Sequence, residues 1–372
     1  MPTELNVNSL VERNNNTTPV LPLVSPKTPK LCLKDLHNRR LTNTTNHPAP
    51  TPVIRISGTN YANAGMISAL TGPPKSGKTT VIGFILATAF SHFNDKAQSL
   101  DIETSFANGR DVVYLDFEQH ISSTQDLQDK VLKYAGLSQT PENLFIYNLL
   151  EMSLDERREC IQVVFSEHDM HLLIIDGLAD ILTSVNDEEK SNALIEELAL
   201  LASKHNTAVV VVIHENKGGG SVRGHLGSQI ERKCAGLISI KKDRERKVHS
   251  IESRLIRIGD DFENVYFHYS EEHKRMVLLD AVATAELQQE AKQGAAEKKQ
   301  EKQKGLMYLC FGDLKELPLK ELRNKVRFHN PSTNSDKNAD YHIKQALDAG
   351  IITVEGERQN RVYTYVAVTP EK

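Results

Sequence analysis

The stretch from Gly72 to Thr79, which has the sequence GPPKSGKT, limits what this chain can fold into more than any other feature. It fits the pattern GxxxxGK[ST] at every position, and its glycines let the backbone curl its amides around phosphate oxygens. The apolar segment Gly65–Thr71 predicts a buried strand before it, and the apolar segment from Lys78 to about Phe93 predicts a helix after it. The N-terminus of that helix adds its dipole to the anion site. The stretch therefore predicts a strand–loop–helix unit that binds phosphate groups.

Two side chains of this loop have specific expected roles. We expect the Lys78 ammonium group to reach the β and γ phosphates of a nucleotide and the Thr79 hydroxyl to bind Mg²⁺. The loop therefore predicts a bound nucleotide with Mg²⁺, and ATP is the nucleotide that the resemblance described below implies. The expected nucleotide-binding residues are Gly72, Pro73, Pro74, Lys75, Ser76, Gly77, Lys78, Thr79 and Thr80.

Short apolar runs alternate with helical stretches over residues 54–280, which predicts an α/β fold with a mostly parallel central sheet. Runs composed almost wholly of Val and Ile are typical of strands that are covered on both faces. The next predicted strands are Asp111–Phe117, Leu144–Leu149, Leu172–Asp176 and Ala208–His214, and the predicted helices are Gln125–Leu137, Asp155–His168 and Asp187–His205. We expect four later segments, which have no helix between them, to form antiparallel edge strands: Leu237–Lys241, His249–Ile258, Val265–His268 and Met276–Leu279.

The loop alone does not identify the class of protein, since a kinase or a small GTPase could carry the same loop. Carboxylates at the ends of two predicted strands are the residues that can distinguish these classes. Asp176 ends one strand, where a carboxylate can hold the water shell of Mg²⁺. Glu118 lies just past the second strand and could polarise the attacking water as a general base. Asp116, two residues back on the same side of the strand, is the competitor. We favour Glu118 because it lies where the crevice at the carboxyl ends of the strands opens.

A glycine-rich loop follows the strand that ends in His214. We expect His214 to sense the γ-phosphate and to relay its presence to this loop, residues 215–228. The loop contains three consecutive glycines together with Lys217 and Arg223, and such a loop can lie along a nucleic-acid backbone. The loop has no aromatic residue for base stacking, and a flexible linker near the site is the alternative interpretation.

A basic segment, Lys241–Lys247, carries five cations and two acids at the end of a predicted strand. It could supply a positive charge to the nucleotide of a neighbouring subunit, as an arginine finger in trans. A solvated hairpin turn is the equally simple alternative.

Composition limits the partners and the compartment. The formal net charge is -4, so any nucleic-acid binding must come from local patches. No apolar run approaches the ~20 residues that span a bilayer, and no signal pattern opens the chain, so we expect no membrane partner. The four cysteines are far apart and form no CxxC pair, which argues against a zinc site or a disulfide scaffold and fits a reducing cytosol: Cys32, Cys160, Cys234 and Cys310. The expected location is cytoplasmic.

The two ends of the chain differ from residues 51–280. Residues 1–50 hold seven of the 14 prolines, eight Asn and no Gly, which predicts a disordered tail in which a short element near Lys30–Leu41 could order by docking. Residues 281–304 predict a charged helical linker. In residues 305–372, three helical segments precede a β-hairpin, with Gly350 at the C-cap of the third, and this is the plan of a small winged helix.

Four features together resemble the RecA-like ATPases: the Gly72–Thr79 loop, the Tyr114–His120 segment with Glu118, the Leu172–Asp176 strand, and a strand that ends in His214 before a glycine-rich loop. With Gly224–Leu237, the stretch is most similar to the RepA-type hexameric helicases, relatives of DnaB and KaiC. This resemblance, over residues 54–280, implies ATP hydrolysis at subunit interfaces of a homo-oligomeric ring, with single-stranded DNA threading its centre. It also implies trans-acting cations among Lys241, Lys242 and Arg244. The polar insertion Asn94–Arg110 has no assignment.

The C-terminal segment resembles winged-helix domains in its Leu347–Ile352 and Arg361–Val366 stretches. Its local charge is weak for a DNA reader, with ten Lys and Arg against nine Asp and Glu, so a DNA-binding and a protein-docking unit both remain open. Four cations lie on one predicted helix: Lys320, Arg323, Lys325 and Arg327.

Two functional hypotheses follow. The first is an oligomeric Mg²⁺-ATP-dependent helicase that acts on DNA in plasmid, phage or mobile-element replication, and the glycine-rich basic loop and the C-terminal segment favour it. The alternative is a KaiC-like regulatory ATPase, or a DNA-loading or repair ATPase, without unwinding activity. The near-neutral charge and the loop's lack of aromatic residues favour this alternative.

Overall fold

The computed structural model describes residues 32–91, 93, 98–215, 224–330, 335–356 and 360–366. The chain divides into two compact units, residues 1–49 and 50–372. Within the first unit, α1 (Leu33–His37) is a short helix in which no residue is buried, and it lies where the sequence predicted a short ordered element. The Asp35 carboxylate accepts a hydrogen bond from the Cys32 backbone N–H at 2.8 Å and so caps its first turn. The predicted disordered tail falls largely on residues 1–31, which lie outside the described residues.

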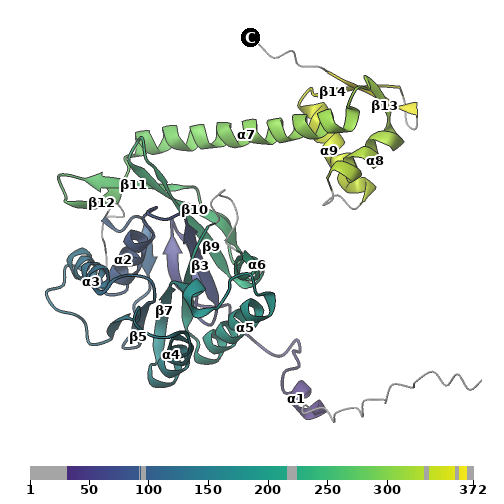
Figure 1. Cartoon of the computed structure of the whole chain (residues 1–372). Helices are drawn as coiled ribbons and strands as arrows, with labels where there is room; N and C mark the ends of the chain where they lie inside the picture. The colour runs from purple at the N-terminus through teal and green to yellow at the C-terminus, as the bar shows by residue number, and fades with distance from the viewer. Residues whose placement is uncertain are drawn as a thin grey trace, which may run out of the picture. The chain divides into compact units, whose positions relative to one another are not determined.

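A nine-stranded sheet forms the centre of the second unit, in the order β12-β11-β10-β9-β3-β8-β7-β5-β6 (Figure 1). The strands from β9 through β3, β8, β7 and β5 to β6 pair in parallel, and those from β9 to β12 pair antiparallel. The predicted α/β fold, with a mostly parallel sheet and antiparallel edge strands, is therefore confirmed. The strands are β3 (Ile67–Gly72), β5 (Asp111–Asp116), β6 (Leu144–Asn148), β7 (Met170–Asp176), β8 (Ala208–His214), β9 (Gly236–Asp243), β10 (Val248–Ile256), β11 (Val265–Ser270) and β12 (Arg275–Leu278).

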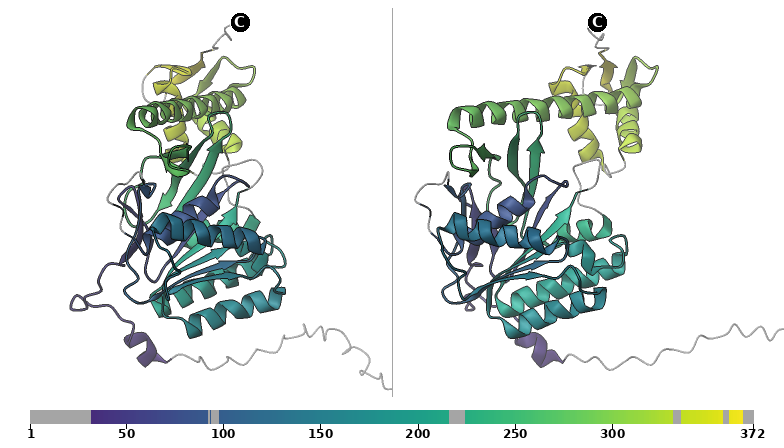
Figure 2. Two further views of the ribbon diagram at one scale, coloured as in Figure 1. Left: turned by 90° about the vertical axis from the view of Figure 1, so that its left-hand side faces the viewer. Right: turned by 60° about the vertical axis from the view of Figure 1, so that its left-hand side comes forward.

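Helices cover both faces of the parallel strands, which explains why β8 is almost entirely Val and Ile (Figure 2). Alternate residues of each strand enter two separate cores. Val210 of β8 packs with α2 and α3 on one face, and its neighbour Val211 packs with α4, α5 and α6 on the other. The helices are α2 (Lys78–Thr88), α3 (Ile121–Ala135), α4 (Leu154–Glu167), η2 (Leu178–Ile181), α5 (Glu188–His205) and α6 (Gly224–Lys233).

A small antiparallel sheet, in the order β2-β1-β4, was not predicted. Its strands are β1 (Pro52–Ile56), β2 (Thr59–Asn63) and β4 (Ile102–Thr104). β4 belongs to the polar insertion at residues 94–110 that had no assignment. The Thr104 hydroxyl donates a hydrogen bond to the Ile85 carbonyl at 3.0 Å, which ties this sheet to the end of α2. That helix ends at Thr88, earlier than the predicted end near Phe93.

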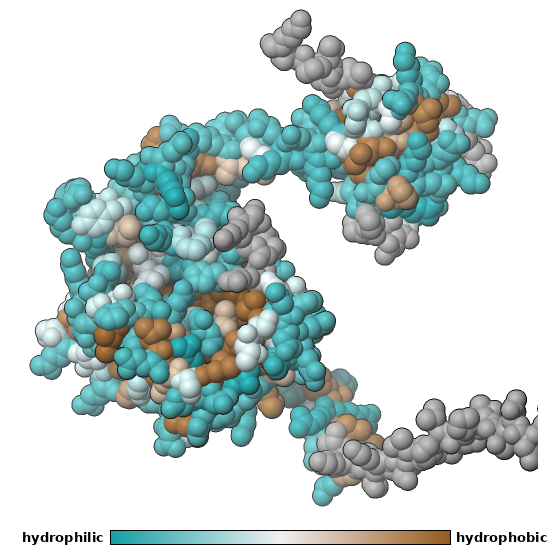
Figure 3. All heavy atoms as spheres, in the orientation of Figure 1, coloured by the Kyte–Doolittle hydropathy of each residue, from teal (hydrophilic) through white to brown (hydrophobic). Residues whose placement is uncertain are grey.

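α7 (Ala281–Phe311) is one continuous helix that runs through the predicted boundary at residue 304. Asp280 caps its start by accepting hydrogen bonds from the backbone N–H groups of Val282 and Ala283. Its middle is exposed and hydrophilic (Figure 3), whereas its last turns bury Met307 and Phe311 in a small core.

The C-terminal segment packs a three-stranded antiparallel sheet, in the order β13-β15-β14, against helices. The predicted hairpin is present, and Gly350 follows the last helix with a φ of +67° as its predicted capping position requires. The strand β13 was not predicted. The elements are β13 (Glu316–Pro318), α8 (Leu319–His329), α9 (Asp336–Asp348), β14 (Ile352–Glu355) and β15 (Val362–Tyr365).

Across the described parts of the chain, no helix is both long enough and apolar enough to cross a bilayer.

Candidate active site

The phosphate loop connects the end of β3 to the start of α2, and its shape requires two glycines. Gly72 and Gly77 have φ angles of +150° and +106°. A Cβ atom on Gly72 would lie only 2.3 Å from the carbonyl oxygen of Ile240 on β9, so a larger residue would separate β3 from β9. Lys75 also has a positive φ of +62°, which completes the curl of the loop.

Lys78 bridges the loop and β8. Its Nζ donates to the carbonyl oxygens of Gly72 and Pro73 at 3.1 and 3.2 Å, and it lies 3.3 Å from Nδ1 of His214. Burial lowers the pKa of Lys78, while the nearby Asp176, Glu118 and Glu215 oppose that shift. The ammonium group therefore lies inside the loop among acceptors.

Glu118 and His214 are in direct contact, and they come from the tips of two different strands. Nε2 of His214 lies 3.0 Å from Oε1 and 3.1 Å from Oε2 of Glu118. Because Lys78 can only donate, Nδ1 of His214 accepts and Nε2 carries the proton that it donates to Glu118. That hydrogen bond is the main reason why the pKa of Glu118 is lowered. The three side chains form one directed series, Lys78 to His214 to Glu118.

Asp176 ends β7 and is buried, with 4% of its surface exposed. The Tyr114 hydroxyl donates to its Oδ2 at 2.8 Å, and Nε2 of Gln119 lies 3.5 Å from the same oxygen. Burial raises the pKa of Asp176 to about 6, although the Tyr114 hydrogen bond lowers it. The folded protein thus holds a carboxylate that a divalent cation would stabilise in its charged form.

Asp116, the competitor of Glu118, is engaged elsewhere. Its Oδ1 accepts hydrogen bonds from the backbone N–H groups of Glu118 and Gln119 at 3.1 and 2.9 Å, and its Oδ2 accepts one from the Thr124 hydroxyl at 2.7 Å. β5 pairs with β7, so Asp116 lies opposite Asp176 in register, but it is fully buried. Asp116 holds the turn after β5, and this turn presents Glu118 at the mouth of the site.

These groups surround a pocket of about 440 Å³ at the carboxyl ends of the parallel strands. Its lining residues are Pro74, Lys75, Ser76, Gly77, Lys78, Thr79, Thr80, Glu118, Gln119, Asp176, His214 and His249. Gly72 and Pro73 contribute carbonyls to Lys78 instead of lining the pocket.

The residues present fit a nucleotide phosphate with Mg²⁺. The loop leaves the buried hydroxyl of Ser76 without a partner among the described residues, as a donor that a phosphate oxygen could use. The Thr79 hydroxyl and the Asp176 carboxylate both line the same pocket, and oxygen ligands of this kind suit Mg²⁺.

Two lining residues were missed by sequence reasoning. Gln119 directly follows Glu118, so its position next to a predicted site residue could have indicated it. His249 lies on β10, far along the chain from the loop, and no local pattern pointed to it.

The structure describes only some of the cations that were predicted to contact nucleic acid or to act in trans. Lys217 and Arg223 lie outside the described residues. The Lys241 ammonium group contacts the Glu252 carboxylate across the β9–β10 pair. Lys242, near the end of β9, and Arg244, at the start of the turn that follows, are both exposed.

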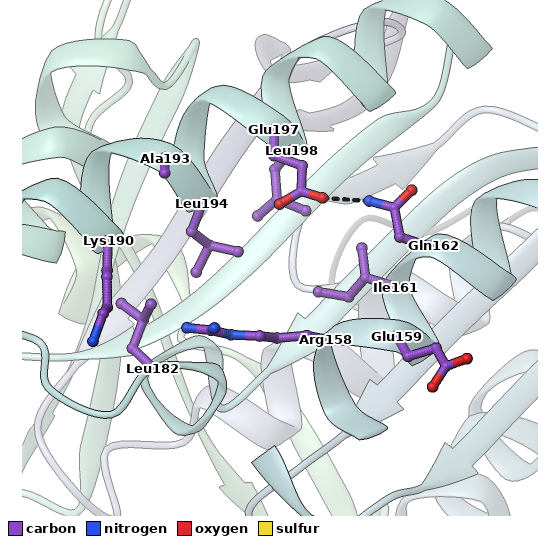
Figure 4. Close-up of a pocket in the computed structure, with 10 residues that line it drawn as sticks. All are labelled: Arg158, Glu159, Ile161, Gln162, Leu182, Lys190, Ala193, Leu194, Glu197 and Leu198. Carbon is purple, nitrogen blue, oxygen red and sulfur yellow. Dashed lines mark hydrogen bonds between the residues drawn. The ribbon is translucent and has the colours of Figure 1, made fainter. Parts of the chain in front are cut away.

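A second pocket, of about 380 Å³, lies between α4 and α5 (Figure 4). Its inner wall is apolar, with Ile161, Leu194 and Leu198, and the Gln162 side chain bonds to Glu197 across it. Its cations and acids are balanced, so it lacks the positive charge that a phosphate group requires.

Comparison with known families agrees with this geometry. A family model described as AAA domain matches residues 30–220, slightly more than half of the chain. The chain belongs to the AAA domain family. Its members are ATPases of the P-loop type, so the chain is a P-loop ATPase of the RecA-like α/β class, and membership implies nucleotide binding, usually with Mg²⁺. The match includes the loop, Glu118, Asp176 and His214, and it ends before β9. A search of the curated proteins gives no match.

Proposed function

We propose that this AAA domain protein is a Mg²⁺-dependent ATPase that acts on DNA as a RepA-type oligomeric helicase in plasmid, phage or mobile-element replication. The observation that most supports this function is the series from Lys78 through His214 to Glu118. It connects a phosphate-binding side chain, a strand tip followed by the glycine-rich loop, and a carboxylate at the mouth of the pocket.

In the proposed mechanism, Lys78 exchanges its carbonyl partners on Gly72 and Pro73 for phosphate oxygens. Thr79 and Asp176 would hold Mg²⁺, and the bound ion would supply positive charge that offsets the negative charge of the phosphates. Glu118 accepts the proton of the attacking water, and its lowered pKa keeps it ionised at neutral pH.

His214 couples the site to the loop at residues 215–228 in this proposal. When Lys78 turns to a phosphate, Nδ1 of His214 loses its donor, and the ring is free to change its contact with Glu118. β8 ends at His214, so a shift of this ring reaches the following loop directly. Lys217 and Arg223 would then change their contact with the DNA backbone.

A homo-oligomeric ring, with six subunits in the family that the sequence resembles, would complete the site. The Glu118 side chain is 43% exposed, so the pocket opens to a surface that a neighbouring subunit could cover. Lys242 and Arg244 are better candidates than Lys241 for the trans-acting cation, because Lys241 already contacts Glu252.

The C-terminal segment is proposed to be a winged-helix-like unit with a limited share in DNA binding. Nε and Nη2 of Arg323 each lie 2.6 Å from a carboxylate oxygen of Asp340, and Nη1 of Arg327 lies 3.0 Å from Asp336. Two of the four cations on α8 are therefore neutralised, which lowers the charge available for phosphates.

The alternative is a KaiC-like regulatory ATPase, or a DNA-loading or repair ATPase, that does not unwind DNA. The neutralised arginines of α8 and the net charge of -4 favour it. Unwinding of a forked DNA duplex, measured with and without ATP, separates the two proposals. ATP-dependent strand separation supports the helicase, and DNA-stimulated turnover without strand separation supports the alternative.

The role of the loop has its own test. Lys217→Ala combined with Arg223→Ala should abolish the stimulation of ATP turnover by single-stranded DNA while the basal turnover remains. Unchanged stimulation in the double variant would exclude the loop as the DNA contact.

A further inference from the structure

His249 contacts the phosphate loop from outside every motif discussed above. It lies on β10, beyond the residues that the family model matches, and it is buried, with 5% of its surface exposed. Its Nδ1 lies 2.7 Å from the carbonyl oxygen of Ser76. A carbonyl oxygen only accepts hydrogen bonds, so Nδ1 carries the proton and donates it.

Two further contacts position the imidazole ring. It stacks on Phe267 of β11, with ring centroids 5.1 Å apart and an interplanar angle of 20°. A Cβ atom on Gly77 would lie 2.8 Å from Nδ1, so the ring also packs directly against the loop backbone. Gly77 is therefore required for this contact as well as for its positive φ.

The hydrogen bond sets the direction of one backbone amide. A trans peptide unit is planar, and its C=O and N–H groups point in opposite directions. Because the Ser76 carbonyl points toward His249, the N–H group of Gly77 in the same peptide unit points away from His249. Ser76 and Gly77 both line the phosphate pocket, where an inward N–H group would bind a phosphate oxygen.

The ring is uncharged near neutral pH. Burial lowers the pKa of His249 and Lys242 lowers it further, while the hydrogen bond to Ser76 opposes both. Lys242 is also the residue opposite His249 in the β9–β10 register. The imidazole thus contributes a single directed N–H donor.

We propose that His249 is a positioning residue for nucleotide binding, which holds the Ser76–Gly77 peptide so that the Gly77 N–H group faces a phosphate oxygen. It also ties the β9–β10 hairpin, which carries the candidate trans-acting cations, to the phosphate loop. This inference rests on the proposed ATPase function of the same pocket.

The test measures the Kd of a fluorescent ATP analogue with Mg²⁺, together with ATP turnover, for the full chain. His249→Phe keeps an aromatic ring against Phe267 and removes the donor. We expect its Kd to rise about tenfold, equal to about 1.4 kcal/mol. His249→Asn places an amide donor near the position of Nδ1 and should restore most of the affinity.

His171→Phe is the matched control. Nε2 of His171 lies 2.9 Å from the Ser105 carbonyl oxygen, and burial lowers its pKa too, but it does not line the phosphate pocket. This variant should bind the analogue as wild type does.

Three results would overturn the role of His249: wild-type affinity in His249→Phe, equal weakening in the Phe and Asn variants, or equal weakening in His171→Phe. Should His249→Phe not fold, His249→Gln replaces it, because its longer side chain places the amide away from Nδ1 and should bind more weakly than His249→Asn. If wild-type protein itself binds no analogue, the proposed ATPase function fails, and this outcome is distinct from the failure of the His249 inference.

Discussion

The parallel strands and the antiparallel edge contribute to the pocket in different ways. The parallel strands β3, β5, β7 and β8 present the chemically active groups at their carboxyl ends. The antiparallel pair β9–β10, whose β9 also pairs in parallel with β3, contributes contacts that shape the loop, through the Ile240 carbonyl beside Gly72 and the His249 ring beside Gly77. The groups that would act on a nucleotide therefore lie on the parallel strands. The conformation of the phosphate loop depends also on contacts from the β9–β10 pair.

The largest effect should come from the parallel half. Glu118→Gln keeps the size of the side chain and the contact with His214 but removes the base, so we expect ATP turnover to fall about 10³-fold with little change in nucleotide Kd. Turnover and binding are measured on the same preparation. Intact turnover in this variant would remove Glu118 from the mechanism.

The antiparallel half should show its largest effect at the hairpin cations. Lys242→Ala combined with Arg244→Ala should lower turnover by up to about 10³-fold in the oligomer, because a trans-acting cation stabilises transition-state charge. Lys247→Ala, an exposed residue in the same turn, is the matched control and should leave turnover unchanged. Equal turnover in the double variant and the control would assign this segment to a solvated turn.

A measurement of the free energy of unfolding tests the cost of burying the Asp176 carboxylate on the parallel strand β7. Burial raises its pKa to about 6 from 3.8, so its charged form destabilises the folded protein near neutral pH. Asp176→Asn should raise the free energy of unfolding by about 2 kcal/mol at about pH 7 without nucleotide, and it should abolish Mg²⁺-dependent turnover.

The sign of the pH dependence follows from the raised pKa. Protonation of Asp176 favours the folded state, so the advantage of the Asn variant should shrink as the pH falls through 6 toward 4. Thermal melts of both proteins across this range measure it. A variant that melts below wild type at neutral pH would contradict the cost assigned to the buried carboxylate.

The smallest effect is expected in the C-terminal segment. Asp340→Asn frees the Arg323 guanidinium and should raise the affinity for single-stranded DNA by about twofold to fivefold, since one phosphate contact is gained. Asp348→Asn, on the exposed end of the same helix, controls for the change in net charge. A rise of equal size in both variants would show a charge effect without a specific role for Arg323.

Sequence reasoning located the features that depend on local pattern. The phosphate loop, the Val and Ile strands and the acids at strand ends are contiguous signals, and parallel pairing then brings Glu118, Asp176 and His214 to one edge. From the sequence, Glu118 was favoured over Asp116 as the general base only because of its position just past the strand. The structure adds a physical reason, because Asp116 accepts hydrogen bonds from the turn.

Features that depend on distant contacts could not be read in the same way. β1, β2 and β4 are short, and β4 pairs with β1 across almost fifty residues of chain, so no local alternation marked them. α7 continues through Gly294 and Gly305, which lower helix propensity but do not end a helix whose last turns are packed. His249 contacts the phosphate loop only because β9 pairs with both β3 and β10, which brings β10 close to the loop after β3.

ATP turnover by the full chain, with and without single-stranded DNA and Mg²⁺, tests most directly that this pocket is a nucleotide hydrolysis site, when it is measured beside the oligomeric mass. We predict Mg²⁺-dependent turnover that rises with DNA, in a species several times the mass of one chain. A purified protein that neither binds nor hydrolyses ATP in the presence of Mg²⁺ would contradict this assignment.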